Sequence, residues 1–231
     1  DLSTTHDSLP PSFLPPTIPN AERIVDALGQ VHAYWWDHPK LGNGIGQPHT
    51  ADSIREQTAA DTKNVLALLE FLGDRISSEQ RDIFDAALEK IQELRTQWLL
   101  GRKDFTLIHD DLHAGNFLYP RNPQKDTLRI IDWKSWSIKP GAADMANMMA
   151  LYWTRERRLQ LQDTLLRRYH ARLLENGVTG YDWETCWNDY RMSIIDLLFF
   201  PVWQWSVGVP DFIWWHNLDR LLIAQRDLSS I

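Results

Sequence analysis

Three oxygen-bearing side chains in the middle of the chain are spaced in a way that suits phosphoryl transfer. Asp111 lies two residues after His109, which itself follows the apolar run FTLI. Asn116 comes five residues after Asp111, and Asp132 ends a second apolar run, LRII. A positioned carboxylate can take the proton of an attacking hydroxyl, whereas an amide and a second carboxylate offer the oxygen ligands that Mg²⁺ prefers. The spacing therefore predicts Asp111 as a base and Asn116 and Asp132 as magnesium ligands.

The loop that carries Asp111 has two further residues with a predicted role. His109 is placed with Asp111 at the predicted catalytic centre. We expect it to hold the loop by hydrogen bonds rather than to transfer a proton. Gly115 permits the tight backbone that is needed between Asp111 and Asn116. We therefore expect the whole loop to form one site.

The rest of the chain is predicted to be helices that position this loop. Asn20 is the expected N-cap of the first helix, and Pro201 is expected to stop a later one. Ser77 and Gln80 form a capping box for a helix that starts at this point. The protein is therefore predicted to be mainly α with a small β hairpin, an α+β class. The expected strands are 105–108, 116–119 and 128–132, and the other expected helices are 20–37, 52–72, 143–152, 155–175, 182–200 and 211–228.

Composition excludes several kinds of partner. The chain has 231 residues and a net charge of −7, so a nucleic-acid backbone is not an expected partner. No run of about 18 apolar residues is present, and no membrane association is expected. The one cysteine, Cys186, excludes an internal disulfide and favours a reducing, cytoplasmic setting.

Three sequence motifs together resemble a known family. IHDDLHAGNFLY, the following IIDW and the later GAADMAN are similar to motifs of the aminoglycoside phosphotransferase and choline kinase-like family, which has a protein-kinase-like fold. The resemblance implies that Asp111 is the catalytic base and that Asn116 and Asp132 hold metal. It also implies that Asp144 braces the catalytic loop. His113 and Trp133 would line the site.

The same resemblance implies a two-lobed enzyme of which this chain is the C-terminal lobe. Residues 1–19 resemble the hinge between the lobes, and residues 20–231 the helical C-terminal lobe, with its catalytic and metal loops at 105–144. The N-terminal lobe of the same protein would carry the glycine-rich loop and the strand lysine that hold the nucleotide. The implied activity is transfer of the γ-phosphoryl group of ATP, or of GTP, to a hydroxyl of a small molecule, with Mg²⁺. The chain alone is expected to be inactive.

The acceptor pocket is expected in the helices after Asp144. The twelve tryptophans are unusual for a chain of this length, and an aromatic wall suits an apolar or a cationic acceptor. Core packing is the simpler explanation for any single tryptophan. The candidate pocket residues in this part of the chain are Asp196, Trp203, Trp205, Trp214 and Trp215.

Two residues depart from the family pattern. Asp110 stands where the family usually has glycine, and it adds a negative charge beside the base. Lys134 stands two residues after Asp132, where the family often has an acidic or amide residue. Either change can tune or impair activity.

Several alternatives to a kinase remain open. One is a catalytically degenerate family member that binds a partner or a small molecule. Another is a His-Asp metal phosphohydrolase, but His32 and His170 lack the pattern of its further ligands. A zinc hydrolase needs a glutamate after His109, where aspartate stands. The structural alternative treats the acids and amides as turn formers and caps.

Overall fold

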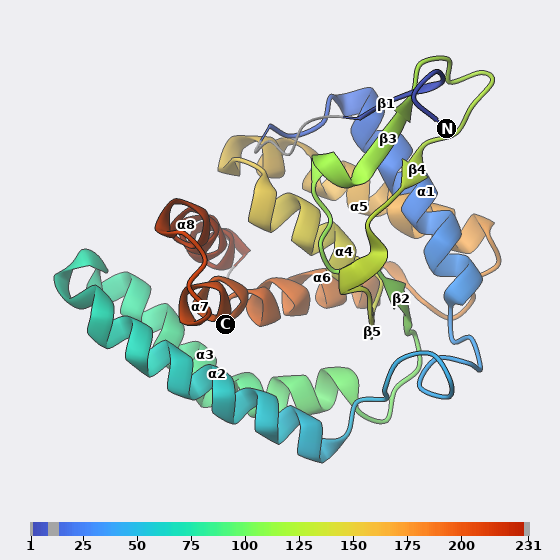
Figure 1. The fold of residues 1–231 in the computed structure, drawn as a ribbon. Helices are drawn as coiled ribbons and strands as arrows, with labels where there is room; N and C mark the ends of the chain where they lie inside the picture. The colour runs from blue at the N-terminus through green and yellow to red at the C-terminus, as the bar shows by residue number, and fades with distance from the viewer. Residues whose placement is uncertain (1, 9–13, 229–231) are drawn as a thin grey trace. The chain divides into compact units, whose positions relative to one another are not determined.

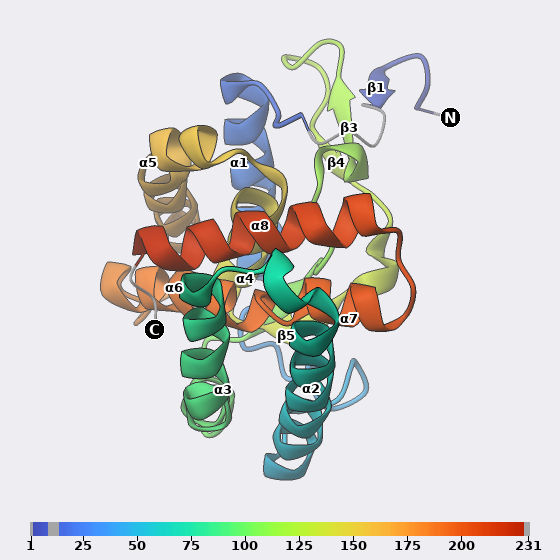
Figure 2. The ribbon, with the colours of Figure 1, turned by 90° about the vertical axis from the view of Figure 1, so that its left-hand side faces the viewer.

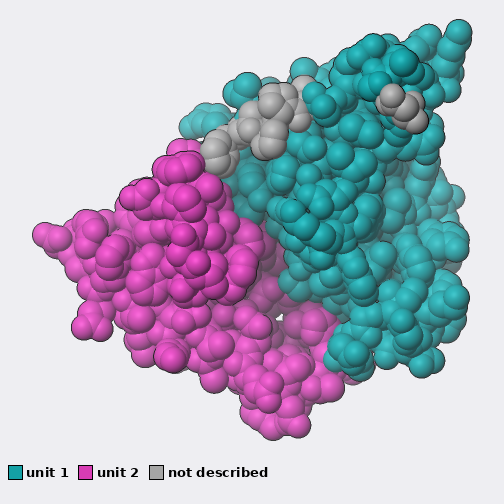
Figure 3. Space-filling view, in the orientation of Figure 1, with its two compact units in different colours: residues 1–48, 103–190 teal, residues 49–102, 191–231 magenta. Residues whose placement is uncertain are grey.

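The computed structural model describes residues 2–8 and 14–228, which form mostly helices with two small antiparallel sheets (Figure 1). This confirms the predicted fold class in its coarse form. The chain divides into two compact units, each built from two separate stretches of sequence (Figure 3). Unit 1 contains residues 1–48 and 103–190, and unit 2 contains residues 49–102 and 191–231. The division at residue 19 into hinge and lobe stays a prediction.

Two long helices support unit 1. Helix α1 (Ile18–Trp35) packs on α5 (Arg155–Glu175) through buried apolar side chains. Asp26 on α1 accepts hydrogen bonds from the guanidinium groups of Arg168 and Arg172 on α5, at 2.7 to 2.8 Å. Burial raises the pKa of Asp26, but the two arginines more than offset this and leave that pKa below its usual value. The carboxylate therefore stays charged and ties the two helices together.

The two sheets carry the loops of interest. Strands β1, β3 and β4 form one sheet in the order β1-β3-β4, and β2 pairs with β5 in the other, all antiparallel (Figure 1). The β3–β4 hairpin was predicted, whereas β5 was not, and β1 lies within the predicted extended lead-in. The bounds are β1 (His6–Ser8), β2 (Thr106–Ile108), β3 (Phe117–Pro120), β4 (Arg129–Ile130) and β5 (Ser137–Lys139).

A short helix and a π-helix follow β5 in unit 1. Helix α4 (Ala142–Ala146) runs without a break into a π-helical segment, Asn147–Leu151, and all ten residues are buried. The predicted helix 143–152 therefore exists, but its second half is wound more loosely than an α-helix. Helix α6 (Trp183–Leu197) starts in unit 1 and ends in unit 2.

Unit 2 is built from helices. Helices α2 (Ala51–Leu72) and α3 (Ser78–Leu99) form a hairpin around a short 3₁₀ turn, Gly73–Arg75 (Figure 1). Helix α7 (Phe200–Ser206) packs on α2 and α8, and a tight connection joins it to α8 (Asp211–Leu228) (Figure 2). In the part of the chain that the structure describes, no helix is long and apolar enough to cross a membrane.

Of the predicted helix ends, the capping box at Ser77 is confirmed and two others are wrong. The capping box at Ser77 is confirmed, since its hydroxyl accepts from the Gln80 amide at 3.2 Å and its own amide donates to the Gln80 side chain at 3.0 Å. The prediction that Asn20 caps α1 is wrong, because the helix begins at Ile18 with a proline in its first turn. The prediction that Pro201 stops a helix is also wrong. Helix α6 ends at Leu197, and Pro201 lies in the first turn of α7, where its missing N–H leaves no helical bond unmade.

Candidate active site

A fully buried carboxylate holds the loop that follows β2. Asp144 accepts backbone hydrogen bonds from the amides of His109 at 2.8 Å and Asp110 at 2.9 Å, one on each carboxylate oxygen. The same oxygen that binds the His109 amide also accepts from Nε2 of His32, at 3.2 Å. One carboxylate thus fixes two successive residues just ahead of Asp111, which is the bracing position that the sequence predicted for Asp144.

The hydrogen-bonded chain continues from Asp144 into the core of unit 1. His32 donates from Nε2 to Asp144, and its Nδ1 is hydrogen-bonded to the Tyr169 hydroxyl, at 2.8 Å. The backbone of Gly141 lies so close that a Cβ there would sit 2.8 Å from Nδ1 of His32 and would overlap the Tyr169 hydroxyl. A side chain at position 141 would therefore separate these two rings.

Asp110 adopts a left-handed backbone conformation. Its φ is +62°, in the left-handed region that glycine enters freely and aspartate tolerates. Its Oδ2 accepts from the Ser137 hydroxyl at 2.9 Å and lies 3.5 Å from Nζ of Lys139. The extra negative charge beside Asp111 is thus partnered by two side chains of β5.

Asn116 connects the loop of Asp111 to the segment of Asp132. Its side-chain Nδ2 donates to the backbone carbonyl oxygen of Asp111 at 2.8 Å. Its backbone carbonyl oxygen accepts from the backbone amide of Ile131 at 3.0 Å. The His109 ring also reaches this segment, with Nε2 bonded to the Ile131 carbonyl oxygen at 2.7 Å. Asp111, Asn116 and Asp132 are therefore brought into one region of unit 1.

Electrostatic interactions agree with this convergence. Burial lowers the pKa of His113 below its usual value, while the charges of both Asp111 and Asp132 act in the opposite direction. Both carboxylates are therefore close enough to act on a single imidazole. His113 is half-buried, as expected for a side chain at the edge of a site.

His109 is placed to support the loop. It is fully buried, its Nε2 donates to the Ile131 carbonyl, and its ring lies 5.0 Å from the indole of Trp133. The Trp133 indole N–H donates to the Ile130 carbonyl oxygen at 3.1 Å. This geometry suits the loop-holding role that the sequence favoured for His109.

Gly115 lies in a short 3₁₀ turn, Ala114–Asn116, between the base and the amide. Its amide donates to Nδ1 of His113 at 3.1 Å, and the amide of Asn116 donates to the His113 carbonyl oxygen at 3.0 Å. The backbone turns sharply here, which brings the Asn116 side chain back under Asp111.

The predicted magnesium ligands offer suitable donors. Asp132 has a left-handed backbone with φ of +61°, and its carboxylate is 43% exposed with Nζ of Lys134 3.2 Å away. The amide nitrogen of Asn116 is engaged by Asp111, which leaves its amide oxygen as the ligand atom. Among the described residues no three His, Cys, Asp or Glu side chains group into a metal site. One amide and one carboxylate oxygen nevertheless fit Mg²⁺, which usually keeps several waters and takes phosphate oxygens.

Two residues that contact the loop were missed by sequence reasoning. The Tyr152 hydroxyl donates to Oδ1 of Asp111 at 3.2 Å, and Oδ1 of Asn147 accepts from the Leu112 amide at 2.7 Å. Both follow Asp144 on the same helical segment. The only available signal was the polar residues that interrupt the apolar run ADMANMMALYW, and a regular α-helix does not place them on one face.

The predicted acceptor-pocket residues after Asp144 all lie in unit 2, whereas Asp111, Asn116 and Asp132 lie in unit 1. Asp196 is bound to the buried guanidinium of Arg95 at 2.8 Å, and Arg95 also pairs with Asp61 at 2.7 Å. The role of these residues in a pocket stays a prediction.

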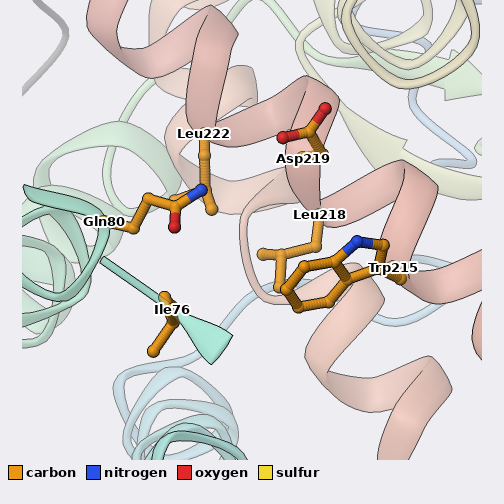
Figure 4. Close-up of a pocket in the computed structure, with 6 residues that line it drawn as sticks. All are labelled: Ile76, Gln80, Trp215, Leu218, Asp219 and Leu222. Carbon is orange, nitrogen blue, oxygen red and sulfur yellow. The ribbon is translucent and has the colours of Figure 1, made fainter. Parts of the chain in front are cut away.

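The four tryptophans of this group differ in environment. Trp214 is buried, Trp205 packs on the Phe71 ring at 5.6 Å, and Trp203 is 50% exposed. Trp215 lines a small, mostly apolar groove in unit 2, to which α8 contributes one wall (Figure 4). The groove is formed by Ile76, Gln80, Trp215, Leu218, Asp219 and Leu222.

Known proteins resemble this chain in sequence and in fold. The sequence model described as "Phosphotransferase enzyme family" matches residues 13–184. No curated protein is matched by the sequence.

Similar solved structures belong to the same class of protein. A choline/ethanolamine kinase family protein from Mesorhizobium loti is 14% identical with a TM-score of 0.54, over 93% of this chain and 62% of that one. An ethanolamine kinase from Plasmodium vivax is 15% identical with a TM-score of 0.57, over 92% and 61%. A candidate aminoglycoside phosphotransferase from Ralstonia eutropha is 15% identical with a TM-score of 0.53, over 95% and 69%. The chain thus spans about three fifths of the length of the first two.

Proposed function

Because this chain belongs to the phosphotransferase enzyme family, we propose that its protein transfers the γ-phosphoryl group of ATP to a hydroxyl of a small molecule. The observation that carries the proposal is the pair of bonds made by Asn116, one to Asp111 and one to the residue before Asp132. They hold the segments that carry a candidate base and two candidate metal ligands next to one another. GTP is the alternative donor.

In the proposed reaction, the acceptor hydroxyl oxygen forms a bond to the γ-phosphorus while the bond from that phosphorus to the β–γ bridging oxygen breaks. Asp111 orients the hydroxyl and takes its proton, and the nucleoside diphosphate leaves with the bridging oxygen. Asp144 and Asn116 keep the loop in place during the exchange, because their bonds to it do not involve the reacting atoms.

Asn116 and Asp132 would hold Mg²⁺, which when bound offsets the negative charge of the phosphate oxygens. The amide of Asn116 is oriented by its bond to Asp111, so its oxygen is presented in one direction. Asp132 contributes charge from a backbone turn that points its side chain partly to solvent.

The nucleotide would be covered by an N-terminal lobe of the same protein. The similar kinases are longer than this chain, and one similar structure, of the protein LicA, is a complex with AMP, at 16% identity and a TM-score of 0.50 over 92% of this chain and 62% of that one. On this proposal the lobe described here is inactive alone. A cytoplasmic setting suits the use of ATP and the single cysteine.

The acceptor is proposed to be a small alcohol that carries an amine or an apolar part. Two of the similar proteins are named for choline or ethanolamine and one for aminoglycosides. The high tryptophan content of the chain suits choline or ethanolamine better than an aminoglycoside, because aromatic faces bind alkylammonium groups.

The test of the proposal is a substrate screen with the full-length protein. ADP release would be measured with Mg-ATP and a panel of choline, ethanolamine, aminoglycosides and simple amino alcohols, with phosphorylated product detected by mass spectrometry. We expect ADP release with at least one acceptor, and no ADP release when that acceptor is left out. Nucleotide binding without turnover on any acceptor would favour the degenerate binding module, for which the Lys134–Asp132 pair is the supporting observation.

Replacing Lys134 by glutamine is expected to lower the Mg²⁺ concentration that turnover requires. The ammonium group lies 3.2 Å from Oδ2 of Asp132 and competes with a metal for that oxygen. Since the ion pair is exposed and weak, the half-saturating Mg²⁺ concentration for turnover should fall by only about two- to fivefold. The control is Lys63→Gln, which removes the same charge from an exposed position on α2. An unchanged or higher Mg²⁺ requirement in Lys134→Gln would contradict Asp132 as a ligand.

A further inference from the structure

The π-helix after α4 places Tyr152 beside the catalytic loop. Its five residues, Asn147–Leu151, are wound so that Tyr152 follows Asn147 by about one π-helical turn. In a regular α-helix five residues are about one turn and a half, and the two side chains would point in different directions. The loose winding therefore puts Tyr152 on the face that already carries Asp144 and Asn147.

Three residues on this face each bind a different part of the loop. Asp144 accepts from the amides of the two residues that precede Asp111. Asn147 accepts from the amide of the residue after it, Leu112, at 2.7 Å. Tyr152 alone reaches the side chain, and its hydroxyl donates to Oδ1 of Asp111 at 3.2 Å. The first two fix the backbone of the loop, and the third fixes the carboxylate.

We propose that Tyr152 is the positioning residue of the base, donating its hydroxyl proton to Oδ1 of Asp111 so that Oδ2 is the oxygen that takes the acceptor's proton. This inference rests on the proposed function. The Tyr152 ring is itself held edge-on against His113, with ring centres 5.5 Å apart. The rotation of the Asp111 carboxyl about its own axis is thereby restricted.

Tyr152 remains a donor over the whole working range of pH. Burial raises the pKa of its hydroxyl well above the usual value, and the neighbouring Asp111 charge raises it further. A phenol that stays protonated continues to donate its hydrogen bond to the carboxylate that it binds.

The test is the steady-state kinetics of Tyr152→Phe in the full-length protein with its best acceptor, with kcat and the KM for ATP measured separately. Loss of one hydrogen bond to a charged group should lower kcat by about tenfold. The KM for ATP should change by less than about twofold, because the hydroxyl does not act on the nucleotide.

A matched control separates this role from loop packing. Tyr119 is also buried, and its hydroxyl donates to the Ala114 carbonyl oxygen of the same loop at 3.2 Å. Tyr119→Phe removes a hydroxyl of the same kind that does not touch a carboxylate, so its kcat should stay near the wild-type value. An unchanged kcat in Tyr152→Phe, or an equal fall of kcat in Tyr119→Phe, would overturn the inference.

Failure of the inference is distinguishable from failure of the proposed function. If Asp111→Asn abolishes turnover and Tyr152→Phe leaves kcat unchanged, only the role of Tyr152 is lost. If Asp111→Asn turns over like the wild type, the base assignment and the inference fall together.

Discussion

Asp111→Asn in the full-length protein is expected to lower kcat by about 10²-fold or more. The substitution keeps the size and shape of the side chain, and the Asn oxygen can still accept from the Tyr152 hydroxyl. It removes the proton acceptor, and general base catalysis typically contributes a factor of about 10² to 10⁴. Steady-state ADP release with a saturating acceptor measures the effect.

The same variant should bind its substrates almost normally. The bonds that shape the loop involve the backbone of Asp111 and its neighbours, and these bonds do not need the carboxylate. The Kd for nucleotide is therefore expected to change by less than about threefold. Asp85→Asn, which makes the same change at an exposed site on α3, is the control and should keep wild-type kcat. Wild-type turnover in Asp111→Asn would leave the loop without a base.

The part of this site that could be predicted depends on residues whose types are chemically distinctive. Asp111, Asn116 and Asp132 are spaced as a base and two hard ligands, and bonds through Asn116 and Ile131 join their segments in the structure. The capping box at Ser77 was predictable for the same reason, because its bonds are local. Local bonds and distinctive side chains are visible in a single sequence.

The missed features depend on pairing or winding that the sequence does not display. Strand β5 has only three residues, Ser137–Lys139, and it forms through its pairing with β2. The π-helical winding that presents Tyr152 has no periodic signal of its own. Pro201 was assigned to the wrong end of a helix because proline is compatible with a first turn as well as with a stop.

The acceptor pocket illustrates a different limit. Asp196 was predicted, together with four tryptophans, to line the acceptor pocket. In the structure its carboxylate binds Arg95, whose guanidinium also holds Asp61 and lies 5.0 Å from the Phe199 ring. Arg95 lies 101 positions from Asp196 in the sequence, and Asp61 lies farther still. Only Phe199 is a near neighbour, so no local pattern reveals the two charged partners. A buried charged group therefore cannot be assigned to a ligand before its protein partners are known.

Asp144→Asn is expected to destabilise the protein more than any other single isosteric change in the site. The carboxylate is fully buried and accepts from the amides of His109 and Asp110 and from Nε2 of His32. Asparagine offers one oxygen in place of two, so its NH₂ group must face at least one of these donors. An unmatched buried donor costs about 1 to 3 kcal/mol, and more when a charged group was its partner. We expect the free energy of unfolding to fall by about 3 kcal/mol or more.

Urea unfolding followed by tryptophan fluorescence measures this loss, because indoles are present in both units. Asp163→Asn is the matched control: its carboxylate lies on the surface of α5, 62% exposed and paired only across one helical turn with Arg167, so its loss should cost under about 1 kcal/mol. If the two variants unfold at the same urea concentration, Asp144 does not hold the loop in the way that its three bonds indicate. If Asp144→Asn is destabilised as expected, kcat should fall with it even where the protein remains folded, because Asp111 follows directly after the two amides that Asp144 fixes.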